Sequence, residues 1–310
     1  MQLLFAGTPA TAVPALEALL TSNHDVVAVL TRPPAQAGRG RRLVSSPVML
    51  RAAAAGIEIL TPPGPRDPAF LDRLVALAPD CAPVVAYGAL LPPDVLDVPP
   101  WGWVNLHFSV LPAWRGAAPV QHAILAGDAL TGATTFRLVA EMDAGPVFAT
   151  VIEAVRPTDT AGSLLERLAR AGADLLLSTL DHLEAGQLQP RPQPSENVSY
   201  APKLRSDDAR VRWEAPAFAV DRRVRACSPA PGAWTWYVGT RLKLGPVSPT
   251  PQVEDLAPGE LRVAPGAVYV GTGSHAVSLG EVQPQGRAAM PADAWARGQR
   301  PAAGARLGSG

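Results

Sequence analysis

Cysteine is scarce in this chain of 310 residues, which contains only two, Cys81 and Cys227. A disulfide framework needs several cysteines, and a structural metal site needs closely spaced pairs of the C-x-x-C kind. The two cysteines lie far apart in the sequence and form neither pattern. We therefore expect two buried thiols and no metal site.

Long apolar runs are also missing, although 47% of the residues are hydrophobic. Charged residues such as Arg73, Glu166 and Arg170 interrupt the candidate helices. No stretch approaches the roughly twenty apolar residues that a membrane span requires. The sequence opens directly on a strand-like run at residues 2–7, without the basic region and cleavage site of a secretory signal. We therefore expect a cytoplasmic protein that does not enter a membrane.

Net charge is absent too, because 27 Lys or Arg balance 27 Asp or Glu. This balance argues against a uniformly basic nucleic-acid binder. Residues 205–310 nevertheless hold thirteen Lys or Arg against nine Asp or Glu, so the C-terminal part is mildly basic. Many domains of this size carry such an excess for solubility alone, and it carries little weight by itself.

What the sequence does contain, over its first two hundred residues, is an alternation of short β-branched runs with amphipathic helical patterns. This alternation is typical of an α/β domain with an open parallel-type sheet and crossover helices. Ser46 and Asp67, each followed by a proline, predict two helix starts, and residues 163–184 predict a long helix that Gly186 ends. The expected strands are 3–6, 26–30, 58–60, 84–87, 104–108, 135–138 and 147–155.

The composition changes after residue 186, where four prolines in a polar context predict a semi-rigid connector. The chain is long enough for two domains. We place an N-terminal domain at residues 1–189, the connector at 190–204 and a C-terminal domain at 205–310. Within the C-terminal domain, Gly and Pro separate short β-like runs, which predict a small β-barrel or sandwich. These runs are 235–238, 241–244, 267–270 and 276–279.

The strand expected at residues 104–108 carries two polar side chains on one face. Strand alternation places Asn105 and His107 on the side opposite to Leu106. A turn at residues 109–112 ends the strand, so His107 is expected at the carboxyl end of a parallel strand, where open α/β sheets bind ligands. Such a pair alone is not specific, because both side chains could simply hydrogen-bond neighbouring loops.

A second polar feature is Asp143, in the turn-forming sequence Asp-Ala-Gly-Pro between two candidate strands. By itself Asp143 would be a turn residue that satisfies its own backbone. An amide, an imidazole and a carboxylate together match what acyl transfer to an amine requires. The amide and the imidazole can stabilise a developing oxyanion, and the carboxylate can orient the imidazole or help to move a proton. No nucleophilic Ser or Cys is needed, because the acceptor amine itself attacks.

Motifs in the same order along the whole chain resemble the methionyl-tRNA formyltransferase family. Those of the N-terminal part are Phe5-Ala6-Gly7-Thr8-Pro9, Val85-Ala86-Tyr87-Gly88, Asn105-x-His107-x-Ser109-x-Leu111-Pro112-x-x-Arg115-Gly116-Ala117-x-Pro119 and Asp143-x-Gly145. Those of the connector and C-terminal part are Tyr200-Ala201-Pro202-Lys203, Ala209-Arg210-Val211-x-Trp213, Pro231-Gly232-Ala233-Trp234-Thr235 and Gly304-Ala305-Arg306-Leu307-Gly308. This order makes the resemblance more specific than any single motif.

The resemblance implies a Rossmann-like formyltransferase domain followed by an OB-like domain that helps to bind tRNA. The implied activity is transfer of a formyl group from 10-formyltetrahydrofolate to the α-amino group of methionyl initiator tRNA, in translation initiation, by a monomeric enzyme. Asn105 and protonated His107 would support the tetrahedral oxyanion. Asp143 would hold His107 and assist proton transfer to the leaving folate nitrogen. The implied donor-binding residues are Tyr87, Gly88, Ser109, Val110, Leu111 and Pro112.

Residues 32–51 contain five arginines and no acidic residue. Such runs are usually solvated surface, but a mobile guanidinium cluster can also grip a phosphate backbone. The resemblance implies that this loop contacts the acceptor end of the tRNA. Basic residues of the C-terminal domain are also expected to contact the tRNA, but an ordinary role as solvated surface residues is an equal alternative for them. The expected tRNA-binding residues are Arg39, Arg41, Arg42, Arg222, Arg223 and Lys243.

The sequence also bears on other functions. Gly7 follows the first strand but lacks the G-x-G-x-x-G pattern, which argues against a dinucleotide site. The nearest alternative is a formyltransferase that acts on the amine of a sugar nucleotide, with the same Asn, His and Asp but no need for the arginine loop. A non-catalytic RNA-binding module that has kept the fold is a second alternative.

Two residues depart from the family pattern. Phe108 stands where a small residue is more common, and Ala230 stands where a Trp is common. Alternation sends Phe108 to the face opposite to His107, so we expect altered packing behind the site and retained activity. The change at Ala230 puts only fine tRNA contacts in doubt.

Overall fold

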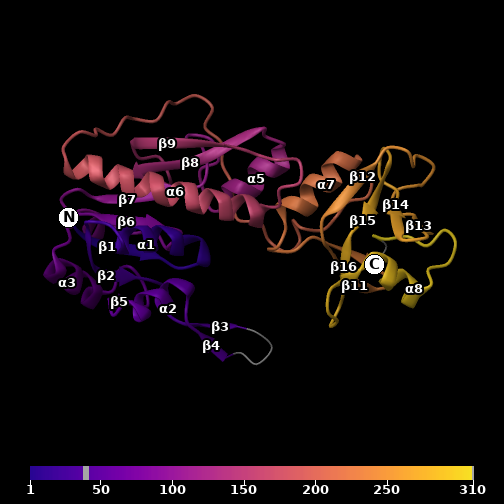
Figure 1. The fold of residues 1–310 in the computed structure, drawn as a ribbon, viewed down its shortest axis with the longest axis horizontal. Coiled ribbons are helices and arrows are strands. Elements are labelled where there is room, and N and C mark those ends of the chain that lie inside the picture. The colour runs from indigo at the N-terminus through magenta and orange to yellow at the C-terminus, as the bar shows by residue number, and fades with distance from the viewer. Residues whose placement is uncertain (38–41, 309–310) are drawn as a thin grey trace. The chain divides into compact units, whose positions relative to one another are not determined.

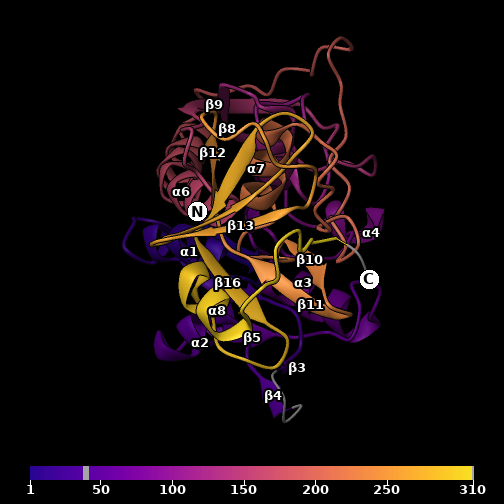
Figure 2. The ribbon, with the colours of Figure 1, turned by 90° about the vertical axis from the view of Figure 1, so that its right-hand side faces the viewer.

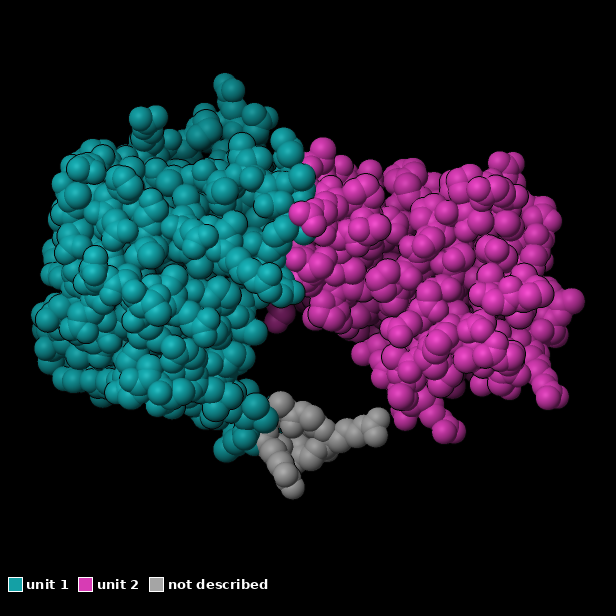
Figure 3. All heavy atoms as spheres, viewed as in Figure 1, with its two compact units in different colours: residues 1–119, 130–154, 165–200 teal, residues 120–129, 155–164, 201–310 magenta. Residues whose placement is uncertain are grey.

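The computed structural model describes residues 1–37 and 42–308 (Figure 1). The chain divides into two compact units, which are described separately (Figure 3). Unit 1 comprises residues 1–119, 130–154 and 165–200, and unit 2 comprises residues 120–129, 155–164 and 201–310. None of the helices in the described residues is long and apolar enough to cross a membrane.

Unit 1 is built on a seven-stranded sheet of order β5-β2-β1-β6-β7-β8-β9. The first five strands in this order are parallel, as predicted, while β8 and β9 run antiparallel to their neighbours. Strand β8 is twice as long as the strand expected at residues 135–138, and a loop without a crossover helix joins it to β9. The strands are β1 Gln2–Gly7, β2 Asp25–Leu30, β5 Glu58–Leu60, β6 Ala82–Val85, β7 Trp103–His107, β8 Leu130–Arg137 and β9 Val147–Ala154.

The helices begin where the capping residues predict. Ser46 accepts a hydrogen bond from the Met49 N–H at 3.0 Å, and Asp67 accepts one from the Ala69 N–H at 3.1 Å. The long helix α6 approaches β7 closely, because a Cβ on Gly172 would lie 2.9 Å from Leu106 Cδ2. The helices are η1 Ala10–Ala12, α1 Val13–Leu20, α2 Pro47–Ala54, α3 Pro68–Leu77, α4 Pro93–Leu96, α5 Pro119–Ala126 and α6 Ala161–Glu184, and a small hairpin pairs β3 Ala35–Ala37 with β4 Arg42–Val44.

Unit 2 contains two four-stranded sheets, whose pairings β10-β11-β16-β17 and β12-β15-β14-β13 are all antiparallel. Strands of both sheets are labelled in Figures 1 and 2. Its buried core includes Trp213, Trp234 and Trp295. The predicted runs correspond to β10, β11, β14 and β15. The elements are α5 from its second residue onward, α7 Ala217–Ala226, β10 Trp234–Tyr237, β11 Thr240–Leu244, β12 Val247–Thr250, β13 Leu261–Ala264, β14 Ala267–Val270, β15 Ala276–Leu279, β16 Glu281–Pro284, β17 Met290–Pro291 and α8 Ala292–Gln299.

Candidate active site

Strand β7 delivers two polar side chains to one cavity of unit 1. Asn105 and His107 border a cavity of about 550 Å³, as does Leu106. The side chain of Leu106, between them, lies against α6 on the other face of the sheet. The imidazole ring of His107 meets the ring of Phe136 on β8 edge to face, with centroids 6.4 Å apart. The His107 ring is therefore held in an apolar setting beside the cavity.

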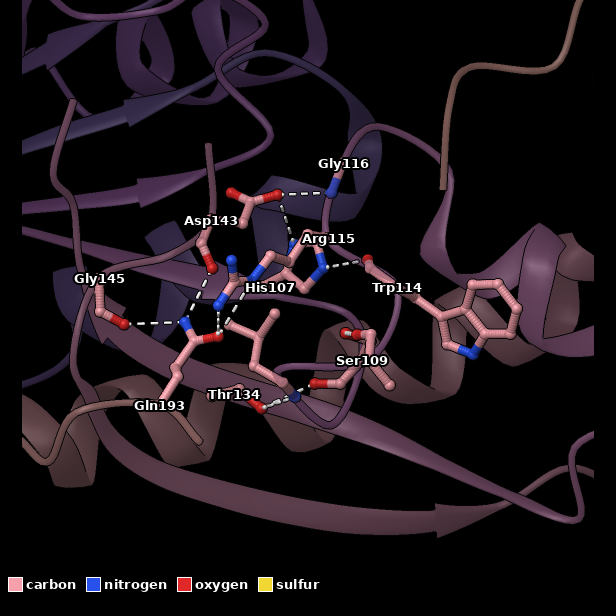
Figure 4. A network of polar contacts seen from close by, with 11 residues as sticks. His107, Ser109, Trp114, Arg115, Gly116, Thr134, Asp143, Gly145 and Gln193 are labelled. Atoms are coloured by element: carbon pink, nitrogen blue, oxygen red, sulfur yellow. Dashed lines mark hydrogen bonds and ion pairs between the residues drawn. The ribbon is translucent and has the colours of Figure 1, made fainter. Parts of the chain in front are cut away.

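His107 is fixed by a backbone carbonyl (Figure 4). Its Nε2 lies 2.9 Å from the carbonyl oxygen of Trp114, a residue in the left-handed backbone region with φ of 60°. Because a carbonyl oxygen only accepts hydrogen bonds, a neutral His107 carries its proton on Nε2. The other ring nitrogen, Nδ1, is then unprotonated and lies 3.7 Å from Asp143 Oδ2.

The charge state of His107 follows from its burial. Loss of solvent lowers the pKa of the imidazole below its ordinary 6.5, although the Asp143 carboxylate and the Trp114 carbonyl act in the opposite direction. The imidazole is therefore neutral near pH 7 in the structure as it stands. The protonated His107 that the resemblance implied supports the tetrahedral oxyanion during the reaction, and that role stays a prediction.

Asp143 lies beside His107 at the same cavity, although 36 residues separate the two in sequence. Its backbone has a φ of 49°, in the left-handed region where Asp is tolerated. Its Oδ2 atom accepts a hydrogen bond from the Gly116 N–H at 2.7 Å. The structure thus brings together Asn105, His107 and Asp143, the three residues predicted to form the chemical centre.

The predicted donor-binding residues divide into two groups. Tyr87 and Gly88, which follow strand β6, border the cavity. Burial raises the pKa of the Tyr87 hydroxyl above its ordinary 10.0, with Arg32 acting in the opposite direction. Among the described residues, the other four predicted positions do not border the cavity: Ser109, Val110, Leu111 and Pro112.

The turn that contains these four residues packs against β8. The Ser109 hydroxyl is fully buried and donates to the Ala113 carbonyl at 2.6 Å. The Thr134 hydroxyl on β8 donates to the Ser109 carbonyl at 2.7 Å and accepts from the Leu111 N–H at 3.3 Å. Sequence order placed this turn next to His107 but could not give the direction in which it folds.

The cavity also has an apolar border that the sequence did not reveal. Leu90, Val139 and Met142 line it while remaining 72%, 40% and 50% exposed. Phe108 contributes to the wall as well. Strand β7 ends at His107, so the alternation that was expected to turn Phe108 away does not extend to it. Apolar side chains are common in loops, and only the three-dimensional arrangement marks these as the edge of a site.

The residues predicted to bind tRNA have different settings. Arg39 and Arg41 lie outside the described residues, and Arg42 begins strand β4. On α7, Arg222 donates to the Ala126 carbonyl at 3.2 Å and Arg223 donates to the Asp208 carbonyl. The two guanidinium groups therefore make internal hydrogen bonds within unit 2. Lys243, on β11, is exposed.

Unit 2 holds a second cluster of arginines, which sequence reasoning missed. Arg210 and Arg241 lie over the ring of Trp234, with distances from Cζ to the ring centroid of 5.9 Å and 3.7 Å. Arg210 and Trp234 border a cavity of about 430 Å³ together with Arg212 and Trp236.

Among the described residues, no group of three or more His, Cys, Asp or Glu side chains lies close enough together to hold a metal ion.

Comparison with known proteins adds the family context. Residues 1–180 match the family described as Formyl transferase, and residues 203–300 match Formyl transferase, C-terminal domain. The chain is 65% identical over 308 residues to the methionyl-tRNA formyltransferase of Thermobifida fusca, with 99% of each chain covered. It is 62% identical over 309 residues to that of Streptomyces coelicolor, with 99% of this chain and 100% of the relative covered.

A solved structure with a similar fold is the N-formyltransferase from Helicobacter canadensis, in complex with folinic acid and dTDP-3-aminofucose. The TM-score is 0.69 at 16% identity, with 91% of this chain and 98% of that chain covered. At this identity the likeness shows the fold alone.

Proposed function

The chain belongs to the formyl transferase family, and on that premise we propose that it transfers a formyl group from 10-formyltetrahydrofolate to the α-amino group of methionyl initiator tRNA. This reaction supports translation initiation. One observation carries the proposal: Asn105, His107 and Asp143 border the same cavity, with Nδ1 of His107 3.7 Å from Oδ2 of Asp143. The chain is similar over nearly its full length to two methionyl-tRNA formyltransferases, and this similarity supports tRNA as the carrier of the acceptor amine.

The reaction forms one bond, from the α-amino nitrogen to the formyl carbon, and breaks one, from the formyl carbon to the folate nitrogen. The amine loses a proton and the folate nitrogen gains one. The bound donor supplies the electrophilic formyl carbon together with its leaving nitrogen. The protein has to orient both substrates, offer a hydrogen bond to the formyl oxygen as charge develops on it, and move the proton.

We assign these tasks to the three clustered residues. The Asn105 amide borders the cavity and can donate to the formyl oxygen. The lone pair on Nδ1 of neutral His107 can take the proton that the amine loses and can then pass it to the leaving folate nitrogen. The positive charge on the ring is then stabilised by the Asp143 carboxylate, whose Oδ2 lies 3.7 Å away. The protonated His107 implied by the family thus arises during the reaction and is absent at its start.

The residues around the cavity fit a folate donor. Leu90, Val139 and Met142 give an apolar border that suits a planar ring, while the polar residues line the wall formed by β7. We propose that Tyr87 and Gly88 contact the donor. The four residues at 109–112 would act indirectly, by shaping the turn that carries the Trp114 carbonyl.

We further propose that residues 1–189 form the catalytic domain, 190–204 the connector and 205–310 a tRNA-binding domain, in a monomeric enzyme of the cytoplasm where translation initiates. The proposed tRNA contacts are basic residues, which suit a phosphate backbone. They are Arg39, Arg41, Arg42, Arg222, Arg223 and Lys243.

A direct assay tests this function. The protein is incubated with 10-formyltetrahydrofolate and, in parallel, with methionyl initiator tRNA or an amino-sugar nucleotide. Formylation of the tRNA alone is expected, and formylation of the sugar nucleotide alone would replace this function with the alternative. The His107→Ala variant should lose formyl transfer and keep its tRNA affinity. Retained turnover in that variant would remove His107 from the mechanism.

A further inference from the structure

Residues 191–200, within the proline-rich connector, touch both turns that surround His107. One turn supplies the carbonyl of Trp114 and the N–H of Gly116, and the other supplies the carboxylate of Asp143. All of these residues belong to unit 1. The sequence predicts only that the connector joins two domains, whereas these contacts show that it also packs against the turns around His107.

Gln193 makes four side-chain hydrogen bonds at this point (Figure 4). Its Nε2 donates to the carbonyl oxygens of Asp143 and Gly145, both at 2.8 Å. Its Oε1 accepts from Nε of Arg115 at 3.2 Å and from Nη2 at 2.8 Å. These partners fix the orientation of the amide, because a flipped group would face carbonyl oxygens with its own oxygen and a guanidinium with its own donors.

The surroundings of Gln193 set it apart from the rest of the connector. Its side chain is half-buried, while Arg191, Pro192 and Pro194 beside it are exposed. Its partner Arg115 is only 7% exposed, so the guanidinium depends on protein acceptors to replace water. Loss of the amide would leave two carbonyls without this donor, and the buried guanidinium would keep its ion pair with Glu141 at 3.6 Å but lose two hydrogen bonds.

Backbone pairing on either side of Gln193 holds the connector in place. Arg191 and Val147 exchange two backbone hydrogen bonds of 2.8 Å and 2.7 Å. Further along, Ser199 accepts from the Trp114 N–H through its hydroxyl and from the Arg115 N–H through its carbonyl, each at 2.9 Å. The segment is therefore anchored at both ends, and Gln193 bridges the two turns between those anchors.

We propose that Gln193 is a positioning residue for formyl transfer, which holds the Asp143 turn so that the carboxylate stays at the Gly116 N–H and faces Nδ1 of His107. This role rests on the proposed function. Glutamine is suited to it because one planar amide offers two donors to the two carbonyls and two lone pairs to the one guanidinium. Alanine offers neither, and glutamate would set a negative charge against two carbonyl oxygens.

Two variants and a matched control test the proposal. Gln193→Ala removes the bridge, and Gln193→Glu keeps the pairing with Arg115 but repels the two carbonyls. Gln189→Ala changes an exposed glutamine directly before the connector. Turnover of the two Gln193 variants should fall by roughly ten- to a hundredfold, as expected for a misplaced catalytic group. Their KM for methionyl initiator tRNA and their tRNA affinity should stay near those of the wild type, and Gln189→Ala should match the wild type throughout.

A second readout separates positioning from simple loss of stability. The Asp143 carboxylate raises the pKa of His107 against the larger effect of burial. A displaced carboxylate should therefore lower the pKa of His107 further and move the acid limb of the turnover profile to lower pH. Titration of the His107 ring by NMR follows the same change without any substrate. A His107→Asn variant assigns the signal among the five histidines.

Each outcome decides the proposal. Wild-type turnover in Gln193→Ala would overturn it, as would reduced turnover with an unshifted acid limb and an unshifted His107 titration. If Gln193→Ala does not fold, the same two readouts apply to Gln193→Glu. Absence of formyl transfer in the wild-type protein would overturn the proposed function instead. A shift of the ring titration in a Gln193 variant would still show that Gln193 positions Asp143.

Discussion

Replacing Gly145 by alanine tests whether the position of the Asp143 turn sets the rate of formyl transfer. A Cβ on Gly145 would lie 1.8 Å from the carbonyl oxygen of Arg137, whereas real Cβ atoms essentially never come within 3.0 Å of another heavy atom. That oxygen belongs to β8, which pairs with β7 on one side and β9 on the other. The turn that contains Gly145 is not paired with a strand on both sides, and so we expect this turn to move and β8 to keep its place.

The size of the effect follows from these distances. The contact must open from 1.8 Å to 3.0 Å, a movement of about 1.2 Å. Displacement of catalytic groups by about 1 Å can lower a rate by roughly a hundredfold. Overfilling a packed site costs about 1–3 kcal/mol of stability. We therefore expect Gly145→Ala to fold, with a reduced free energy of unfolding, and to lose about two orders of magnitude in the rate of formyl transfer.

Single-turnover formylation of methionyl initiator tRNA measures this rate, and thermal unfolding reports the fold. Gly64→Ala is the matched control, because a Cβ on Gly64 meets nothing within 4 Å and its φ lies outside the left-handed region. The control should equal the wild type in both measurements. A folded Gly145→Ala variant that transfers formyl at the wild-type rate would refute the link between the turn and catalysis.

Three further predictions follow from the buried and charged groups. Burial lowers the pKa of His107 in the folded chain, so His107 becomes protonated in the unfolded chain first as the pH falls below about 6.5. Denaturant titrations should therefore show a free energy of unfolding that falls below this pH, and that falls less in His107→Asn. Burial raises the pKa of Cys81 to about 12 and raises that of Cys227, so a thiol reagent at pH 8 should label neither cysteine until the protein unfolds. Lys243→Ala should weaken tRNA binding and reduce its salt dependence by about one counterion. Arg222→Ala should weaken tRNA binding and also lower stability, because the Arg222 guanidinium bonds the Ala126 carbonyl.

The parts of the site that could be predicted are those that depend on local pattern. A period of two along β7 was enough to predict that Asn105 and His107 share one face, and both border one cavity in the structure. The proximity of Asp143 depends instead on how the loop between β8 and β9 folds back. The residue types suggested that proximity, and the resemblance to a family supported it.

The parts that could not be predicted depend on the direction of a turn or on one distant side chain. The turn at residues 109–112 packs against β8, because the Thr134 hydroxyl bonds to the Ser109 carbonyl and the Leu111 N–H. The bridge from Gln193 to Asp143 spans fifty residues. Neither contact leaves a periodic signal in the sequence. The antiparallel direction of β8 and β9 was missed for a related reason, since alternating runs alone do not reveal how a connection crosses the sheet.

The resting charge of His107 decides the order in which protons can move. A free α-amino group has a pKa of about 8, so a buried imidazole whose pKa lies below 6.5 is the weaker base. His107 therefore gains little by deprotonating the free ammonium, and the neutral fraction of the amine is the form that attacks. Once the nitrogen is bonded to the formyl carbon it becomes far more acidic, and the proton can then pass to Nδ1. Burial keeps this acceptor empty at neutral pH until that point, and the Asp143 carboxylate, 3.7 Å away, stabilises the charge when it arrives.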